Sequence, residues 1–418
     1  MIIAAIAACK PIDPLPQKPT TDPEQKEEPE PDPTPTPTPV AVKIDTIDFN
    51  IENTGAKGYM DYVYEHPYKT SDFSATYIED YYKKPRNDGY RGDCPDGYEI
   101  KWESVLGASS YRITVSENED MSDPVQTAST NARTLAYTVS NMIPGHNYHC
   151  TVSAQYTDEY GTDIYKAFIR ASGRRRMIKA ESVGNVRDLG GLCTENGKHV
   201  RYGLLFRGSR LNAQGITISN DDSKVLLNLG IKADLDLRQN ESGKLGDCYT
   251  TRKSPLGSDV DWELFPRANE SYFAQLRKND EYIKAIQWMI DELKAGKPVY
   301  FHCKTGADRT GTLAFLIESL LGVTETDKSI DFELTSFFYD FGDPKEYAFR
   351  SRSLSRTIVI AGKDKYDWEG MYNVIDQNYT GSTYRQKVYN YLNKGIGTSS
   401  SATISSTDLD WFIGHMLE

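Results

Sequence analysis

The sequence is short of positive charge and of long apolar runs. Its 418 residues include 48 lysines and arginines against 60 aspartates and glutamates, so the formal net charge is -12. That sign is wrong for a protein that grips nucleic acid through its phosphates, and we expect no nucleic-acid partner. Beyond the first few residues, no apolar stretch is long enough to cross a bilayer. Aromatic residues make up 11% of the chain, which indicates a folded body.

Histidine is scarce as well, with six in the whole chain. His146, His149 and Cys150 have side chains that can ligate a metal, but no second group of ligands with suitable spacing accompanies them. We therefore interpret them as strand residues. The sequence predicts neither a metal site nor a cofactor.

The first nine residues, MIIAAIAAC, are small and apolar up to Cys9. They resemble the end of a bacterial lipoprotein signal, which is cut before a cysteine that then carries lipid. The positively charged start of a signal peptide is missing, and a start codon assigned too late would account for that. The resemblance implies an exported protein anchored by Cys9 to a bacterial membrane, in the periplasm or at the cell surface. The alternative is a disordered N-terminus with an incidental cysteine.

Residues 10–40 contain eleven of the 20 prolines, interleaved with acidic residues. A segment of this composition cannot bury a core, and it predicts an extended, semi-rigid polyproline tether. Such a tether would hold the folded part of the chain away from a membrane.

Residues 41–175 are expected to form an all-β domain with its core at about 94–172. Short alternating segments such as SYRITVSE and NYHCTVSAQY are separated by turn residues, as in a β-sandwich. Trp102 and the turn at 142–148, MIPGHNY, resemble a fibronectin type III domain, which implies a spacer or binding module. Residues 41–93 either extend this sandwich or form a separate small unit.

Residues 176–418 alternate strand-like runs with helical ones, which predicts an α/β domain with a central sheet flanked by helices. Glycines mark two of the expected helix ends. Gly296 follows the helical run that ends in DELKA, and Gly322 follows the run that ends in IESLL.

Residues 298–311, PVYFHCKTGADRTG, begin as an apolar strand and end in the first turn of an apolar helix. A loop whose backbone N–H groups turn inward at a helix N-terminus binds anions. Arg309 adds a planar guanidinium that can bind two phosphate oxygens at once. The expected phosphate-binding residues are Lys304, Thr305, Gly306, Ala307, Asp308 and Arg309.

Cys303 occupies the first position of this loop, where the positive field favours the thiolate. Its pKa should fall below the free value of ~8.5, which makes it a candidate nucleophile. Thr310 is placed to hydrogen-bond the sulfur. His302 is expected to be buried and to shape the loop rather than to act as an acid or base. The alternative for Cys303 is an inert core cysteine.

The string His302-Cys303-x5-Arg309-Thr310 is the signature of the cysteine-dependent protein tyrosine and dual-specificity phosphatase superfamily, which the chain resembles from about 180 to 330. Three further segments are similar to the bacterial secreted tyrosine-phosphatase branch. They are NVRDLGG at 185–191, LFRGS at 205–209 and DLDLR at 234–238.

The resemblance implies a two-step reaction through a cysteinyl-phosphate, with a general acid to protonate the leaving alcohol. The Trp-Pro-Asp loop of many superfamily members has no counterpart here. In the bacterial branch an aspartate directly before the arginine takes its place, and Asp308 matches that position. Asp236, Asp259 and Asp261 are reserve candidates. Alternatively, Asp308 only ties the loop to a cation. The charged residues of NVRDLGG at 185–191 and the pair Asp236 and Arg238 are expected to form a buried network that supports the loop, with direct catalysis by them as the alternative.

The substrate is a phosphorylated protein or a small phosphate ester. Lys304 resembles the lysine of lipid-phosphatase relatives, which would favour an inositol phosphate, but Ala307 replaces a second lysine of that group. Phosphotyrosine is therefore the first expectation and a phosphoinositide or inositol phosphate the alternative. A third hypothesis is a surface adhesion lipoprotein whose phosphatase fold is silent, but such a chain has no reason to retain Cys303 and Arg309.

Export would place the cysteines in an oxidising compartment, where they can pair. Cys94 with Cys150 and Cys193 with Cys248 are possible pairings within domains, although the sequence does not determine the connectivity. Cys303 must stay reduced if it is the nucleophile.

Overall fold

The computed structural model describes residues 42–51, 60–61, 64–65, 97–157, 161–213, 216–239, 251–266, 276, 280–335, 367–396 and 402–418. The expectations for Cys9 and for the tether at 10–40 lie outside these residues, as do Cys94 and Cys248. Val40–Glu418 form one compact unit, and the description below concerns that unit alone.

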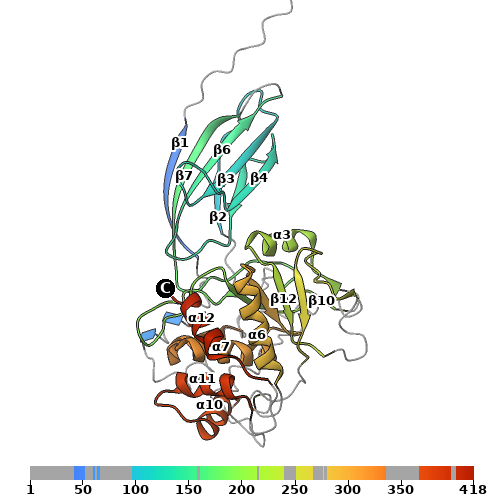
Figure 1. The fold of residues 1–418 in the computed structure, drawn as a ribbon. Helices are drawn as coiled ribbons and strands as arrows, with labels where there is room; N and C mark the ends of the chain where they lie inside the picture. The colour runs from blue at the N-terminus through green and yellow to red at the C-terminus, as the bar shows by residue number, and fades with distance from the viewer. Residues whose placement is uncertain are drawn as a thin grey trace, which may run out of the picture. The chain divides into compact units, whose positions relative to one another are not determined.

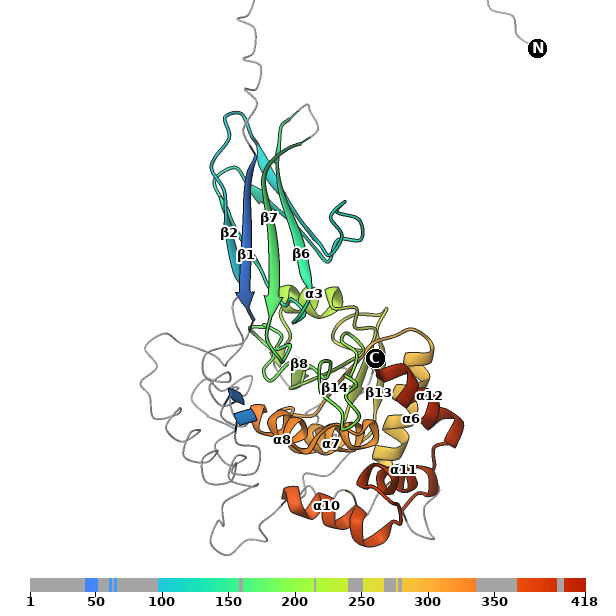
Figure 2. The same cartoon turned by 90° about the vertical axis from the view of Figure 1, so that its left-hand side faces the viewer.

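The first part of this unit is all β. Its larger sheet has the strand order β1-β7-β6-β3-β4, and β2 pairs with β5 in a smaller sheet (Figures 1 and 2). The strands are β1 (Lys43–Asn50), β2 (Tyr98–Lys101), β3 (Ser110–Ser116), β4 (Gln126–Asn131), β5 (Ala136–Val139), β6 (Asn147–Gln155) and β7 (Thr162–Ser172).

Both of these sheets bury side chains in one shared core. Every second residue of β6 is buried, including Tyr148 and Cys150, which is the period of two that a half-buried strand requires. Ile100 of β2 and Val139 of β5 belong to the same hydrophobic cluster as these β6 side chains. The predicted sandwich packing is therefore present. β1 runs parallel to β7 in the larger sheet, so the described residues 43–50 extend the sandwich.

The second part of the unit contains a five-stranded sheet of order β13-β12-β14-β9-β8. The strands β13, β12, β14 and β9 run parallel, and only β8 is antiparallel. All four residues of the central strand β14 are buried, as expected for a parallel strand covered on both faces. The strands are β8 (Arg187–Asp188), β9 (Leu205–Gly208), β12 (Ala233–Asp236), β13 (Asp261–Leu264) and β14 (Val299–His302), with a separate pair β10 (Asn212–Ala213) and β11 (Ile216–Thr217).

Helices accompany this sheet, some packed directly on it and others on those helices, which gives the predicted α/β arrangement (Figure 1). They are α3 (Asn220–Asn228), α6 (Glu281–Lys294), α7 (Asp308–Leu321), α8 (Glu325–Leu334), α10 (Asp367–Asn378), α11 (Tyr384–Lys394) and α12 (Ser406–Met416). None of the helices in the described ranges has the length and apolar character needed to cross a membrane.

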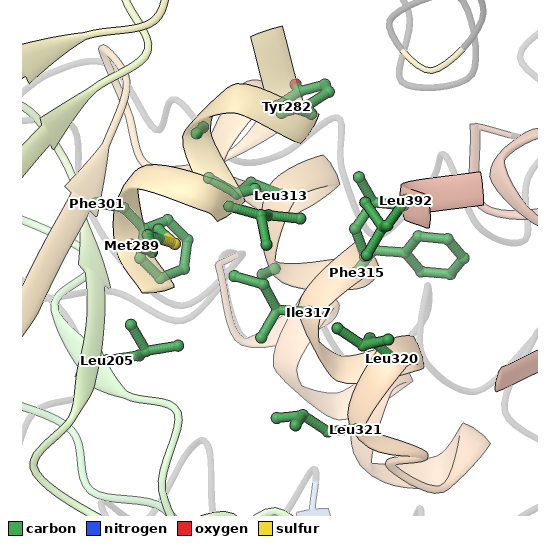
Figure 3. Close-up of a cluster of buried hydrophobic side chains, with 14 of the residues drawn as sticks. Leu205, Tyr282, Met289, Phe301, Leu313, Phe315, Ile317, Leu320, Leu321 and Leu392 are labelled. Atoms are coloured by element: carbon green, nitrogen blue, oxygen red, sulfur yellow. The ribbon is translucent and has the colours of Figure 1, made fainter. Parts of the chain in front are cut away.

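Helix α7 is the centre of this packing. Every residue from Thr310 to Leu321 is buried, so the helix is enclosed on all sides. Figure 3 shows Leu313, Ile317 and Leu321 of α7 in one cluster with Met289 of α6, Phe301 of β14 and Leu392 of α11. Gly322 ends α7 in the left-handed conformation, with a φ of 75°, and Gly296 adopts a φ of 73° just after α6. Both predicted glycine stops are confirmed. The rigid core fixes the direction in which the N-terminus of α7 points.

Candidate active site

The candidate site lies between the carboxyl end of β14 and the N-terminus of α7. β14 ends at His302, and α7 begins at Asp308. Cys303 follows the strand directly and is only 1% exposed. The short loop between them therefore presents its backbone to the positive end of the helix dipole.

The pKa of Cys303 is lowered from its ordinary value. Burial opposes the charged form, but the Arg309 guanidinium and the neighbouring Thr310 outweigh it. Cys150 is equally buried in the sandwich core, and there burial raises the thiol pKa to about 12. The contrast assigns the shift to the loop, since burial alone acts in the opposite direction.

Gly306 allows the loop to lie against the neighbouring strand. Its φ is 71°, and a Cβ at this position would lie 2.4 Å from the Gly208 carbonyl oxygen and 3.0 Å from Asn185 Nδ2. Both the backbone conformation and the space exclude a larger residue.

Replacing Gly306 with alanine should therefore lower kcat/KM by about 100-fold or more, because the loop must move away from Gly208. The free energy of unfolding should fall by about 1–3 kcal/mol. Gly296→Ala is the matched control: Gly296 has a φ of 73°, but a Cβ there would meet nothing within 4 Å. It should cost stability and leave activity unchanged. Equal kinetics for the two variants, measured with purified proteins, would contradict the argument.

Side chains from outside the loop hold its carbonyl groups. Asn185 Nδ2 donates to the carbonyl oxygens of Thr305 at 3.2 Å and Gly306 at 3.0 Å. Arg207 Nη2 also donates to the Gly306 carbonyl, at 3.0 Å. On the other side, the backbone N–H and Nη1 of Arg210 both lie 3.2 Å from the Lys304 carbonyl oxygen. The carbonyl groups of Lys304, Thr305 and Gly306 are thus hydrogen-bonded to side chains outside the loop.

His302 sits in a cluster of charged side chains beneath the nucleophile. Its Nε2 lies 3.0 Å from Asp234 Oδ1, and its Nδ1 lies 3.2 Å from the carbonyl oxygen of Cys303 and 4.0 Å from Asp236 Oδ1. Burial lowers the pKa of His302, but the two carboxylates outweigh it, so the net shift is upward. Asp236 in turn accepts hydrogen bonds from Nε and Nη2 of Arg238. This arrangement suits a structural role for His302.

Asp308 is half-buried at the first position of α7. Burial raises the pKa of its carboxyl to about 6, against the opposing effects of the Arg309 guanidinium and a backbone hydrogen bond. A carboxyl with this pKa carries a proton over part of the neutral range, which a general acid requires. In the same loop, Lys304 is exposed, whereas Ala307, the residue before the helix, is buried.

The reserve candidates for the acid are placed less favourably. In the parallel register Asp261 pairs with Ala233, at the amino end of the strands, while Asp236 pairs with His302 at the carboxyl end. Asp261 is exposed and forms an ion pair with Lys297, and Asp259 is exposed just before it. Neither reserve reaches the loop, because both stand at the opposite edge of the sheet. Asp236 lies at the carboxyl edge of the sheet, next to the loop, but it forms an ion pair with Arg238.

The other sequence-level candidates are ordinary side chains of the sandwich. His146 Nδ1 lies 3.0 Å from Glu117 Oε1, His149 contacts the Phe168 ring, and Cys150 faces the core. Within the part of the chain that the structure describes, no cluster of ligands could hold a metal. Cys150 and Cys193 carry free thiols, and their suggested partners lie outside the described residues.

Two buried carboxylates near the loop were not predicted from the sequence. Asp331 of α8 binds Arg187 and Arg207, and Asp234 lies against His302. Asp234 could have been recognised, because two aspartates alternate with apolar residues in ADLD, which forms the fully buried strand β12. Nothing in the sequence around Asp331 distinguishes it, because its partners lie more than 100 residues away.

Comparison with known proteins places this site in a family. A model described as "Tyrosine phosphatase family" matches residues 178–404. A Cupriavidus necator protein described as a candidate tyrosine-protein phosphatase is 30% identical over 169 residues, which are 37% of this chain and 60% of that protein. The chain thus spans about 60% of that relative's length, which is less than two thirds.

Two solved structures overlap with parts of the chain. P. aeruginosa TpbA is 21% identical with a TM-score of 0.23, over 37% of this chain and 82% of that one. An Fn3-like protein from Clostridium thermocellum is 23% identical with a TM-score of 0.16, over 18% of this chain and 76% of that one. The family model covers more than half of the 418 residues and includes the whole strand, loop and helix of the site, and the chain belongs to the tyrosine phosphatase family.

Proposed function

We propose that the protein hydrolyses phosphate monoesters, with phosphotyrosine in proteins as the first substrate, through a cysteinyl-phosphate on Cys303. The observation that carries the proposal is the placement of the buried Cys303 thiol at the start of the loop between β14 and α7, where the Arg309 guanidinium favours its thiolate and lowers its pKa. A thiolate in this position is a nucleophile that lies next to the group it attacks, because the same loop binds the phosphate.

In the first step, the Cys303 sulfur attacks phosphorus as the bond from phosphorus to the tyrosine oxygen breaks. The leaving oxygen takes its proton from the Asp308 carboxyl, whose pKa of about 6 suits the task. The backbone N–H groups of the loop and the Arg309 guanidinium stabilise the charge on the equatorial oxygens.

In the second step, water attacks phosphorus and the bond to sulfur breaks. The Asp308 carboxylate accepts the proton from that water, and Thr310, which helps to lower the pKa of Cys303, stabilises the departing thiolate. Inorganic phosphate is released and the starting form of the enzyme is regenerated, so the cycle consumes no cofactor.

We further propose that the enzyme is an exported lipoprotein, with lipid on Cys9 and a tether at 10–40. In this proposal residues 41–175 form a fibronectin type III-like spacer and 176–418 the catalytic domain. The support for the division is that the sandwich cluster ends with Ala171, whereas the clusters of the α/β part begin at Ile178. Detergent extraction of the wild type, but not of Cys9→Ser, from a bacterial membrane tests the anchor.

We expect the full chain to hydrolyse a phosphotyrosine peptide with a kcat/KM at least about 100-fold above that for a phosphoserine peptide. A phenol, with a pKa of ~10, leaves more easily than an aliphatic alkoxide, which is more basic. The assay should include an inositol phosphate, because the exposed Lys304 beside the loop can bind a second anionic group. Faster turnover of the inositol phosphate would contradict the phosphotyrosine assignment and support the alternative.

A further inference from the structure

The loop carbonyls that point away from the pocket are held by a buried ionic cluster that the mechanism above does not use. The Gly306 carbonyl oxygen accepts hydrogen bonds from two donors, Asn185 Nδ2 and Arg207 Nη2, each at 3.0 Å. Both donors lead back to the same carboxylate, Asp331 of α8.

The first route is direct. Arg207 donates through Nη1 to Asp331 Oδ2 and through Nη2 to Gly306, so one planar guanidinium bridges the carboxylate and the loop. The Arg207 side chain is 1% exposed and Asp331 is 2% exposed. A rigid fork in a packed interior has little freedom to reorient.

The second route passes through Arg187. Its Nε donates to Asp331 Oδ1 at 2.6 Å and its Nη2 to the Asp331 carbonyl at 2.7 Å, while its Nη1 donates to Asn185 Oδ1. This last bond fixes the orientation of the Asn185 amide, which leaves Nδ2 facing Thr305 and Gly306. Thus Asp331 orients the hydrogen-bond donors on both routes.

The consequence for the pocket follows from peptide geometry. In a planar trans peptide the C=O and the next N–H point in opposite directions. If the Thr305 carbonyl is drawn toward Asn185, the Gly306 N–H points the other way. In the same way, because the Gly306 carbonyl points toward Asn185 and Arg207, the Ala307 N–H points away from these two side chains. The two N–H groups then face the side on which a phosphate would bind.

The cluster is also costly to bury, which argues that it is kept for its geometry. Two guanidinium groups and a carboxylate are removed from water, and apolar side chains of similar volume are often at least as stabilising. The nearby Glu318 carboxyl has a pKa raised well above its ordinary value by burial and by the Asp331 carboxylate.

We propose that Asp331 is a positioning residue for catalysis: through Arg187, Arg207 and Asn185 it turns the Gly306 and Ala307 N–H groups toward the substrate phosphate. The proposal rests on the proposed phosphatase reaction. It adds α8, which contributes nothing to the signature motif, as the support of the phosphate site.

The test compares Asp331→Asn with Asp327→Asn in the full-length protein. Asp327 lies one turn earlier on α8, is 0% exposed, and forms an ion pair with Arg175 Nη2 at 2.9 Å. It also accepts hydrogen bonds from the Tyr64 hydroxyl and the Cys193 backbone N–H, and these three partners lie outside the loop. Both variants lose a buried carboxylate and should show lower melting temperatures. Only Asp331→Asn should lower kcat/KM for an aryl phosphate, by about 100-fold, weaken orthovanadate inhibition about tenfold or more, and raise the pH midpoint of Cys303 alkylation.

Three outcomes decide the matter. If Asp331→Asn and Asp327→Asn change kinetics, orthovanadate inhibition and alkylation alike, the cluster is merely structural and the proposal is wrong. If Asp331→Asn does not fold, Arg207→Lys replaces it: the charge opposite Asp331 stays, but a single ammonium cannot bridge Asp331 and Gly306, and the same selective loss is expected. If the wild type shows no Cys303-dependent hydrolysis, the proposed function fails, and binding of inorganic orthovanadate by the variants still decides the role of Asp331.

Discussion

Replacing Cys303 with serine should reduce hydrolysis of an aryl phosphate by at least about 10⁴-fold, because a serine hydroxyl at this position stays protonated and is a far weaker nucleophile than the thiolate. The size of the loss follows from the reaction proposed: without a thiolate the first step does not occur, and what remains is binding. Steady-state rates of the purified variant provide the measurement.

The same variant should still bind phosphate. The loop N–H groups and Arg309 are unchanged, and loss of the negative sulfur removes a repulsion from the bound anion, so inorganic phosphate should bind at least as tightly as to the wild type. Cys193→Ser is the matched control, since Cys193 is a free, partly exposed cysteine whose pKa is raised by burial. It should retain full activity. Undiminished hydrolysis in Cys303→Ser would exclude the cysteinyl-phosphate mechanism.

The strand, loop and helix of the site could be predicted because their signals are local. The apolar run at 298–302, the glycines at 306 and 311, and the apolar run that follows determine a buried strand, a turn and a buried helix with little help from distant residues. The helix stops at Gly296 and Gly322 are equally local, since each needs only a left-handed φ.

Elements whose stability depends on distant partners were not evident from the sequence. β4 reads QTASTN, a polar segment whose residues alternate between half-buried and exposed, and it is a strand because β3 pairs with it. β1 joins the sandwich through a parallel pairing with β7, about 120 residues away. Neither segment has an apolar pattern strong enough to predict its own pairing.

The charged residues of the site show the same limit. The sequence offered Asp259 and Asp261 as reserve candidates for the acid, but the parallel register puts Asp261 at the amino edge of the sheet, with Asp259 just before it in the chain. Conversely, Asp331 is essential to the arrangement around Gly306, and only the packing of α8 against α7, seen in Figure 2, brings it there. Local motifs predicted the nucleophile and the buried charged residues at 185–191, 236 and 238, whereas the contribution of Asp331 to that network depends on tertiary structure.

Asp308→Asn should slow a substrate with a poor leaving group, such as phenyl phosphate, by about 10²–10³-fold, while an activated nitrophenyl phosphate should lose much less. The amide cannot donate a proton to the leaving oxygen, and the loss therefore grows with the basicity of that oxygen. Asp261→Asn, which changes an exposed aspartate at the opposite edge of the sheet, is the control and should leave both rates unchanged.

The pH dependence gives an independent test of the same residue. The acid is competent while Asp308 is protonated, so activity toward phenyl phosphate should fall as the pH rises through about 6, where the pKa of this carboxyl lies. The opposing limb, at lower pH, reflects ionisation of Cys303 and of the substrate phosphate, and Asp308→Asn should keep it. In that variant the alkaline limb should vanish, because the group that titrates there is gone. An alkaline limb that persists, or equal slowing of the phenyl and nitrophenyl esters, would exclude Asp308 as the acid and leave it as a side chain that holds the loop near Arg309.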